Sequence, residues 1–187
     1  MPKLVASFLG RDCPGVVSAV AGLMEEIHCD IVEVSQTILN GEFAAIFIVT
    51  APDSVDDSAL SRHLQLGLAQ RRIDLSAIVR PAVEGCWGGG AHCEPFVVTA
   101  DGPDKPGLIA SMSGVFSRHG VNIENLKALS GEGGEGHALF VFEVMVPPTV
   151  EIALLRRELV EQGQRLSLRV GVQHRDIFEA VHRVLPV

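Results

Sequence analysis

The fold is decided by a stretch that occurs twice, and its second copy reads Ala100-Asp-Gly-Pro-Asp-Lys-Pro-Gly-Leu-Ile-Ala-Ser-Met-Ser-Gly-Val-Phe-Ser-Arg-His-Gly-Val-Asn-Ile-Glu124. The first copy reads Leu9-Gly-Arg-Asp-Cys-Pro-Gly-Val-Val-Ser-Ala-Val-Ala-Gly-Leu-Met-Glu-Glu-Ile-His-Cys-Asp-Ile-Val32. Matching residues lie 92 positions apart, from Asp12 and Asp104 to Ile31 and Ile123. Such an ungapped offset indicates an internal repeat. The sequence therefore predicts two copies of one structural unit.

Each copy is expected to contain an amphipathic helix, the first running from about Pro14 to Ile27. Apolar residues recur on one helical face in both copies. They are Val16, Val17, Val20, Leu23 and Met24 in the first and Leu108, Ile109, Met112, Val115 and Phe116 in the second. Pro14 and Pro106 are placed in the first helical turn, where a missing N–H loses no hydrogen bond.

The start of each helix is a candidate binding site. Gly15 and Gly107 keep side-chain atoms away from it, so its backbone amides and positive dipole end stay open to an anion. Asp12 and Asp104 stand just ahead and offer a carboxylate to a cation. Amides for an anion beside a carboxylate for a cation suit a zwitterion such as a free amino acid.

Composition excludes several classes of protein. With 15 basic and 23 acidic residues the net charge is −8, which disfavours direct binding of nucleic acid. No apolar run has the length of a membrane span, and the start of the chain leads directly into a strand pattern, so we expect a cytoplasmic protein that does not bind a membrane. The four cysteines are scattered and indicate no disulfide framework.

The order of expected elements is strand, helix, strand, strand, helix, strand in each half. In the first half the strands are expected at 3–9, 31–39, 43–49 and 73–79, and the second helix at about 57–71. Asn40-Gly41 predicts a tight hairpin turn. In the second half the strands are expected at 95–100, 121–129, 137–146 and 165–172, and the second helix at about 149–162.

A βαββαβ unit of this size predicts a four-stranded antiparallel sheet with both helices on one face, the ferredoxin-like arrangement of the α+β class. We assign the first domain to residues 1–81, a glycine-rich linker to 82–94, the second domain to 95–173 and a C-terminal helical tail to 174–187. The second face of each sheet must be covered. The two domains or a second chain are the candidates, and we expect a homodimer.

The Asp-x-Pro-Gly helix start, followed after one helix by a turn and Val121-Asn-Ile123, resembles the ACT domain. Two such domains filling most of the chain are similar to the glycine cleavage system transcriptional repressor group. The resemblance implies a regulatory module that holds a small ligand, often an amino acid, between the first strand–helix loop of one domain and a strand of its neighbour.

The resemblance also implies which residues bind. They are Asp104, Lys105, Pro106, Gly107, Leu108 and Asn122 in the second copy and Asp12, Cys13, Pro14, Gly15, Val16 and Asp30 in the first. Asn122 matches an asparagine that contacts ligand in amino-acid-binding members, whereas Asp30 departs from that pattern. We expect these positions to converge at one end of each sheet. The alternative is structural: the aspartates satisfy backbone donors at the helix start, and Asn122 and Asp30 serve a turn.

Two further features are candidate signs of catalysis or of metal binding. Cys13 lies at a helix start, which favours a nucleophile, but Lys105 replaces it in the second copy. Cys86, His92 and Cys93 offer soft metal ligands in the linker, but their spacing matches no common zinc site. We therefore predict no catalytic residue, no metal and no cofactor.

The leading hypothesis for function is a non-catalytic regulator. It binds an amino acid, such as glycine or serine, and controls a partner protein, such as a transcription factor. One alternative is a detached regulatory subunit of an amino-acid biosynthetic enzyme. Another is a relative of formyltetrahydrofolate deformylase, whose catalytic portion lies in a following domain where this chain has a repeat.

Overall fold

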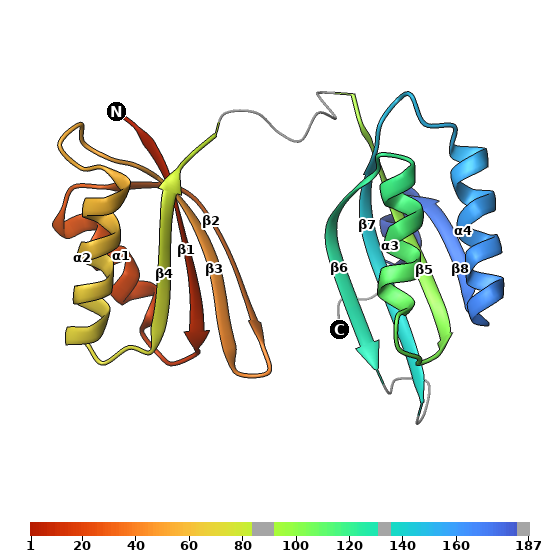
Figure 1. The fold of residues 1–187 in the computed structure, drawn as a ribbon, viewed down its shortest axis with the longest axis horizontal. Helices are drawn as coiled ribbons and strands as arrows, with labels where there is room; N and C mark the ends of the chain where they lie inside the picture. The colour runs from red at the N-terminus through yellow and green to blue at the C-terminus, as the bar shows by residue number, and fades with distance from the viewer. Residues whose placement is uncertain (84–91, 131–135, 183–187) are drawn as a thin grey trace. The chain divides into compact units, whose positions relative to one another are not determined.

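The computed structural model describes residues 1–83, 92–130 and 136–182 and divides the chain into two compact units, Met1–Glu84 and Gly85–Val187 (Figure 1). We call them the first unit and the second unit. Both are four-stranded antiparallel sheets with two helices, so the predicted α+β, ferredoxin-like fold class is confirmed. Most of the predicted linker, with Cys86, lies outside the described residues.

The first unit runs β1 (Lys3–Arg11), α1 (Val16–Glu26), β2 (Asp30–Leu39), β3 (Glu42–Thr50), α2 (Asp57–Gln70) and β4 (Leu75–Pro81). Its strand order is β2-β3-β1-β4. Asn40 and Gly41 both have positive φ, at 51° and 80°, as the predicted Asn-Gly hairpin turn requires. Asp56 caps α2, because its Oδ1 accepts a 2.7 Å hydrogen bond from the amide of Ala59.

The second unit repeats this order with β5 (Glu94–Pro103), α3 (Leu108–Arg118), β6 (Asn122–Ser130), β7 (His137–Val146), α4 (Ile152–Leu166) and β8 (Arg169–His174). Its strand order, β6-β7-β5-β8, is that of the first unit. A further helix, α5 (Arg175–His182), follows β8, and the rest of the predicted tail lies outside the described residues.

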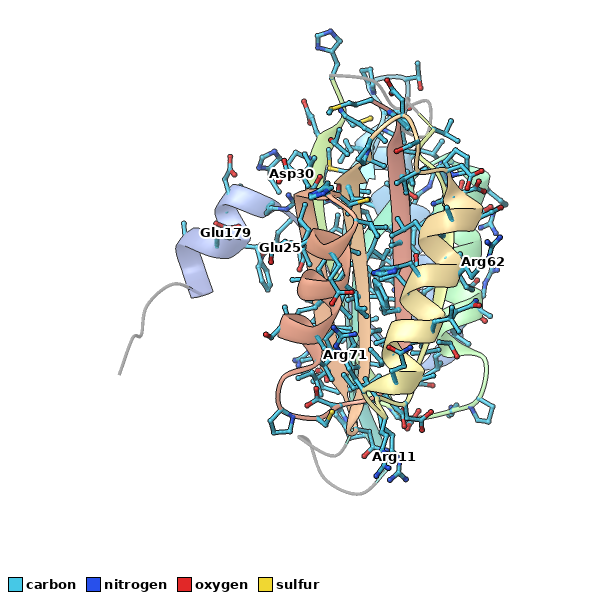
Figure 2. All side chains as sticks on the ribbon, turned by 90° about the vertical axis from the view of Figure 1, so that its left-hand side faces the viewer. Arg11, Glu25, Asp30, Arg62, Arg71 and Glu179 are labelled. Carbon is cyan, nitrogen blue, oxygen red and sulfur yellow. The ribbon has the colours of Figure 1, made fainter. Side chains whose placement is uncertain are left out.

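Each unit has its own hydrophobic core between the sheet and the two helices. Figure 2 shows α1 and α2 lying over one face of the first sheet. Val20, Leu23 and Met24 of α1 are fully buried there, as are Leu60 and Leu64 of α2. The second core is built from the matching positions of α3 and α4. Burial of this alternating apolar face supplies the main favourable free energy of each unit.

Two details differ from the sequence prediction. Pro14 and Pro106 precede the helices instead of lying in their first turn, and Gly15 and Gly107 are the N-cap residues. Val17 and Ile109, expected on the buried face, are 41% and 40% exposed.

Helix α4 and strand β8 of the second unit also lie later in the chain than the sequence predicts. The helix begins at Ile152 instead of Thr149 and continues to Leu166, which delays β8 to Arg169. The alternation of apolar residues at 166, 168 and 170 is typical of a strand and therefore placed the strand too early. In the structure Leu166 belongs to the helix, and Leu168 is buried in the connection that follows.

Candidate functional site

The two helix-entrance loops, residues 12–15 and 104–107, have the same geometry. Gly15 and Gly107 adopt left-handed conformations, with φ of 92° and 86°. A Cβ at either glycine would meet nothing within 4 Å, so the backbone conformation and not a lack of space selects glycine. No side chain of a described residue caps either helix. The structural alternative, in which Asp12 and Asp104 cap the helices, is therefore wrong.

Each loop is fixed to the far end of a hairpin by its aspartate. The Asp12 amide donates to the Gly41 carbonyl at 2.9 Å, and the Asp104 amide donates to the Gly136 carbonyl at 2.8 Å. The backbone of each aspartate is thus held while its carboxylate projects from an exposed residue. Among the described residues, no group accepts a hydrogen bond from the Ile109 or Ala110 amide at the start of α3. These donors are available to an anion.

The loop of the second unit borders a cavity of about 240 Å³. Its lining combines loop residues with the first turn of α3 and two strand residues; these are Asp104, Lys105, Gly107, Leu108, Ile109, Ala128 and Phe140. The polar part therefore holds one carboxylate, one ammonium group and helix amides, while Ile109, Ala128 and Phe140 supply apolar surface. The carboxylate and the helix amides are the groups that the sequence analysis offered to a zwitterion, and Lys105 was added by the resemblance to the ACT domain. The lining residues Ile109, Ala128 and Phe140 were not among the predicted site residues.

The loop of the first unit differs in charge. Asp12, Cys13, Pro14 and Gly15 are exposed, and Val16 is buried. Cys13 takes the place of Lys105, so this loop lacks the second loop's ammonium group. No hydrogen bond or ion pair joins Cys13 to a described residue that could act as its base. With the same backbone geometry but no ammonium group at this position, this loop is less suited than the second loop to hold a carboxylate.

Asn122 and Asp30 do not join the helix-entrance loops, and the expected convergence at one end of each sheet is wrong within a unit. Asn122 pairs with Met145 at one end of β7, whereas Pro103, just before Asp104, pairs with His137 at the other end. Figure 2 labels Arg11 and Asp30 at opposite ends of the first unit. The cause is the intervening helix, whose 11 residues span about 16 Å.

Asn122 borders a separate cavity of about 360 Å³. It lies at the C-terminal end of α3, where Ser113, Ser117, Gly120 and Ile123 also contribute to the lining. A single ligand in one copy of the second unit cannot reach both this cavity and the helix-entrance loop.

The sequence analysis did not predict a cluster of three charged or titratable side chains that contact one another. On the second sheet, Asp101 accepts from Arg169 Nη2 at 2.6 Å and lies 2.6 Å from His137 Nε2. These contacts hold the pKa of Asp101 below its usual value, His137 contributing most. The three residues are distant in sequence, and only the strand register brings them together. A cross-strand charge pair offers no sequence motif.

A second missed feature is a glutamate in each unit that joins its two helices. Glu26 lies 3.2 Å from His63 and 2.6 Å from Arg71. In the second unit Glu158 lies 3.1 Å from His119 and 3.4 Å from Arg118. The hydrogen bond with His119 is the main reason that the pKa of Glu158 is lowered.

The described residues contain neither a metal-binding cluster nor a membrane-spanning helix. No three or more His, Cys, Asp or Glu side chains among them are grouped so that they could hold a metal ion. No described helix has the length and apolar character needed to cross a bilayer.

Family models of the ACT domain match residues 3–77 and again residues 96–156. This chain belongs to the ACT-domain family. The first match runs from β1 to the first part of β4, and the second runs from β5 to the first part of α4. ACT domains generally bind small-molecule ligands such as amino acids.

The relatives include single-domain proteins of about half this length. A UPF0237 protein of Methanopyrus kandleri is 35% identical over 88 residues, which are 47% of this chain and 96% of that protein. A second, from Pyrobaculum aerophilum, is 34% identical over 94 residues, or 49% of this chain and 99% of that protein. These matches support a duplication of one ACT unit.

Two solved structures share the tandem arrangement. A protein of unknown function from Galdieria sulphuraria has a TM-score of 0.70, 20% identity and coverage of 92% of this chain and 98% of that one. A proposed glycine cleavage system transcriptional repressor has a TM-score of 0.65, 17% identity and coverage of 92% and 96%. At these identities the likeness shows the tandem fold alone.

Proposed function

We propose that this ACT-domain protein is a non-catalytic regulator that binds a small free amino acid at the helix-entrance loop of its second unit. One observation carries the proposal. The loop presents open helix amides, an ammonium group and an exposed carboxylate around one cavity of about 240 Å³. The ligand carboxylate is bound by the Ile109 and Ala110 amides and by Lys105, and Asp104 binds its ammonium group.

The size of the cavity favours a small ligand such as glycine or serine. Pro106 and Gly107 shape the backbone around the carboxylate, and the buried Leu108 anchors the first turn of α3 beneath it. The first loop, with Asp12, Cys13, Pro14, Gly15 and Val16, is the weaker of two related sites because it has no cation at Cys13.

Asn122 takes part only if two copies of the chain meet. Because Asn122 and Asp104 lie at opposite ends of α3, a ligand that touches both must bind the loop of one copy and the start of β6 in another. We therefore propose a homodimer in which the ligand favours one arrangement of the two chains. Asp30 holds the corresponding place in the first unit and adds a negative charge there.

The signal passes to a partner protein, for which a transcription factor is our first candidate. The net charge of −8 disfavours direct contact with nucleic acid, so control of transcription requires an intermediary. The tandem fold shared with a proposed glycine cleavage system transcriptional repressor supports this choice. We place the protein in the cytoplasm, where free amino acids report on metabolism.

The alternatives are separated by what the protein binds in the cell. Copurification with a biosynthetic enzyme supports the detached regulatory subunit, and copurification with a transcription factor supports the repressor-like role. Turnover of formyltetrahydrofolate by the purified chain would support the enzymatic alternative. We expect no turnover, because this chain has a second ACT unit where the deformylase has its catalytic portion.

The ligand proposal is tested by the thermal midpoint of the full chain across a panel of the free amino acids. We expect one or a few small amino acids to raise it, and Asp104→Asn and Lys105→Gln each to abolish the rise. Asp12→Asn, the matched change in the first unit, leaves most of it. A rise that survives both changes in the second loop places the pocket elsewhere. Asn122→Ala tests the dimer, because it reduces the rise only if a second copy completes the site.

A further inference from the structure

The sheet of each unit has a second face that its own two helices do not cover, which we call the open face. In the first unit it is apolar along the three strands β1, β3 and β4; its residues include Val5, Ser7, Leu9, Ala44, Ile46, Ile48, Ser76 and Ile78. In the second unit the matching positions hold a groove of about 570 Å³ with charged groups on its border.

A glycine forms part of the floor of the groove. Gly171 of β8 pairs with Thr99, and the matching pair in the first unit is Ile78 with Ser7. The second unit therefore has no side chain of its own strand β8 at the position that an isoleucine side chain occupies in the first unit. A Cβ at Gly171 would lie 2.8 Å from the Thr99 hydroxyl oxygen, so this hydroxyl occupies part of the space.

The walls of the groove are apolar. Leu139 and Val141 of β7 form one side. Phe178 of α5 forms another, and α5 is fixed at its start by a 2.8 Å hydrogen bond from Arg175 to Glu124 of β6. Arg175 is part of α5, which has no counterpart among the described residues of the first unit, so this wall distinguishes the second unit.

One border of the groove is charged. Asp101 stands where the first unit has Leu9, and Arg169 stands where it has Ser76. Asp101 is already bonded to Arg169 and His137 through its two oxygens. The Arg169 side chain is 87% exposed and uses one of its five N–H donors in this pair. The group that remains open to a ligand is thus a cation with spare donors and not an anion.

We propose that this groove binds a monocarboxylate with a branched or aromatic apolar tail. The carboxylate accepts from the free N–H groups of Arg169, and the tail lies on Leu139, Val141 and Phe178 above Gly171. The amino acids and the 2-oxo acids with such tails share this chemistry. The groove lies on the open face, whereas the helix-entrance cavity contains Phe140 and Ala128, which face the helices. The two sites are therefore separate, and this proposal does not depend on the proposed function.

The probe is 4-methylpentanoate, titrated into the full chain by isothermal calorimetry. We expect saturable binding with a Kd below about 10 mM and no binding of 4-methylpentylamine, which has the same tail and the opposite charge. Arg169→Gln removes the charged donors and weakens binding about ten- to a hundredfold. Arg165→Gln, an exposed arginine of α4 outside the groove, is the matched control and leaves the Kd unchanged.

A second variant tests the tail. Phe178→Ala shortens one wall without changing the sheet, so it weakens 4-methylpentanoate several-fold. Titrations with leucine and with 4-methyl-2-oxopentanoate distinguish an amino acid from a 2-oxo acid as the natural ligand. Tighter binding of either compound supports the proposal and identifies the class of ligand. Asp104→Asn leaves the Kd of the probe unchanged even where it abolishes the response to small amino acids. Equal binding of acid and amine, no binding at about 10 mM, or an unchanged Kd in Arg169→Gln overturns the proposal.

Discussion

The two units have one fold but use its surfaces differently. Both place a left-handed glycine before the first helix, and both join their helices through a glutamate flanked by a histidine and an arginine. In the first unit this glutamate, Glu26, is on the first helix, whereas in the second Glu158 is on the second helix. Both units thus make the same type of contact between their helices, but the acidic and the basic residues lie on opposite helices in the two units.

The open faces differ more than the helical faces. The first unit presents Ile46 and Ile78 at positions where the second has Val141 and Gly171, and it has Leu9 where the second has Asp101. Side chains in the core are constrained by packing on all sides, but an open face is free to change. A duplicated fold can therefore keep its core and assign different roles to its surfaces.

The largest expected effect concerns the shared core. Leu64→Ala and Leu159→Ala remove matching side chains that are fully buried. Each is expected to reduce the free energy of unfolding of its own unit by about 2–5 kcal/mol, the usual range for a buried leucine. Chemical denaturation followed by a probe in each unit measures this. If either change destabilises both units equally, they do not unfold independently.

The next effect concerns the shared loop conformation. Gly107→Ala and Gly15→Ala force an L-residue into the left-handed region and are each expected to cost about 1–2 kcal/mol. Gly22→Ala is the control, because Gly22 lies inside α1 with nothing within 4 Å of an added Cβ. It is expected to stabilise by about 1 kcal/mol. A loss for Gly22→Ala, or none for the loop glycines, would contradict the conformational argument.

The glutamate between the two helices of the second unit predicts that the stability of this unit depends on pH. The pKa of Glu158 is lowered in the folded state, so its contribution to stability is present above the unfolded value and is lost as the pH falls through the folded pKa. The thermal midpoint of the second unit should decrease on going from about pH 6 to about pH 3, and less so in Glu158→Gln. Equal acid sensitivity of the two proteins would exclude Glu158 as a source of the effect.

The smallest effect tests whether the open face of the first unit is covered. Ile78 is 68% exposed within the described structure, so Ile78→Thr should change the free energy of unfolding by less than about 0.5 kcal/mol. Analytical ultracentrifugation of the same variant records its oligomeric state. A loss of several kcal/mol, or a change of oligomeric state, shows that another surface packs on this face.

The sequence alone determined the repeat, the order of elements and the open helix starts. The 92-residue offset and the apolar periodicity can be recognised in the sequence itself, because a duplicated unit repeats its residues and an amphipathic helix repeats its apolar positions at a fixed spacing. The Asn40-Gly41 turn followed directly from the two residues that adopt it. The helix starts were displaced by two residues, because a proline before a left-handed glycine resembles a proline in the first turn.

The tertiary structure decided which of these residues meet. Asn122 was expected beside Asp104, but an intervening helix puts them at opposite ends of the second unit. Conversely, Asp101, His137 and Arg169 have no shared motif and meet only because β5 lies between β7 and β8. The physical reason is that strand pairing joins residues far apart in the chain, and its register follows from the packing of the whole core.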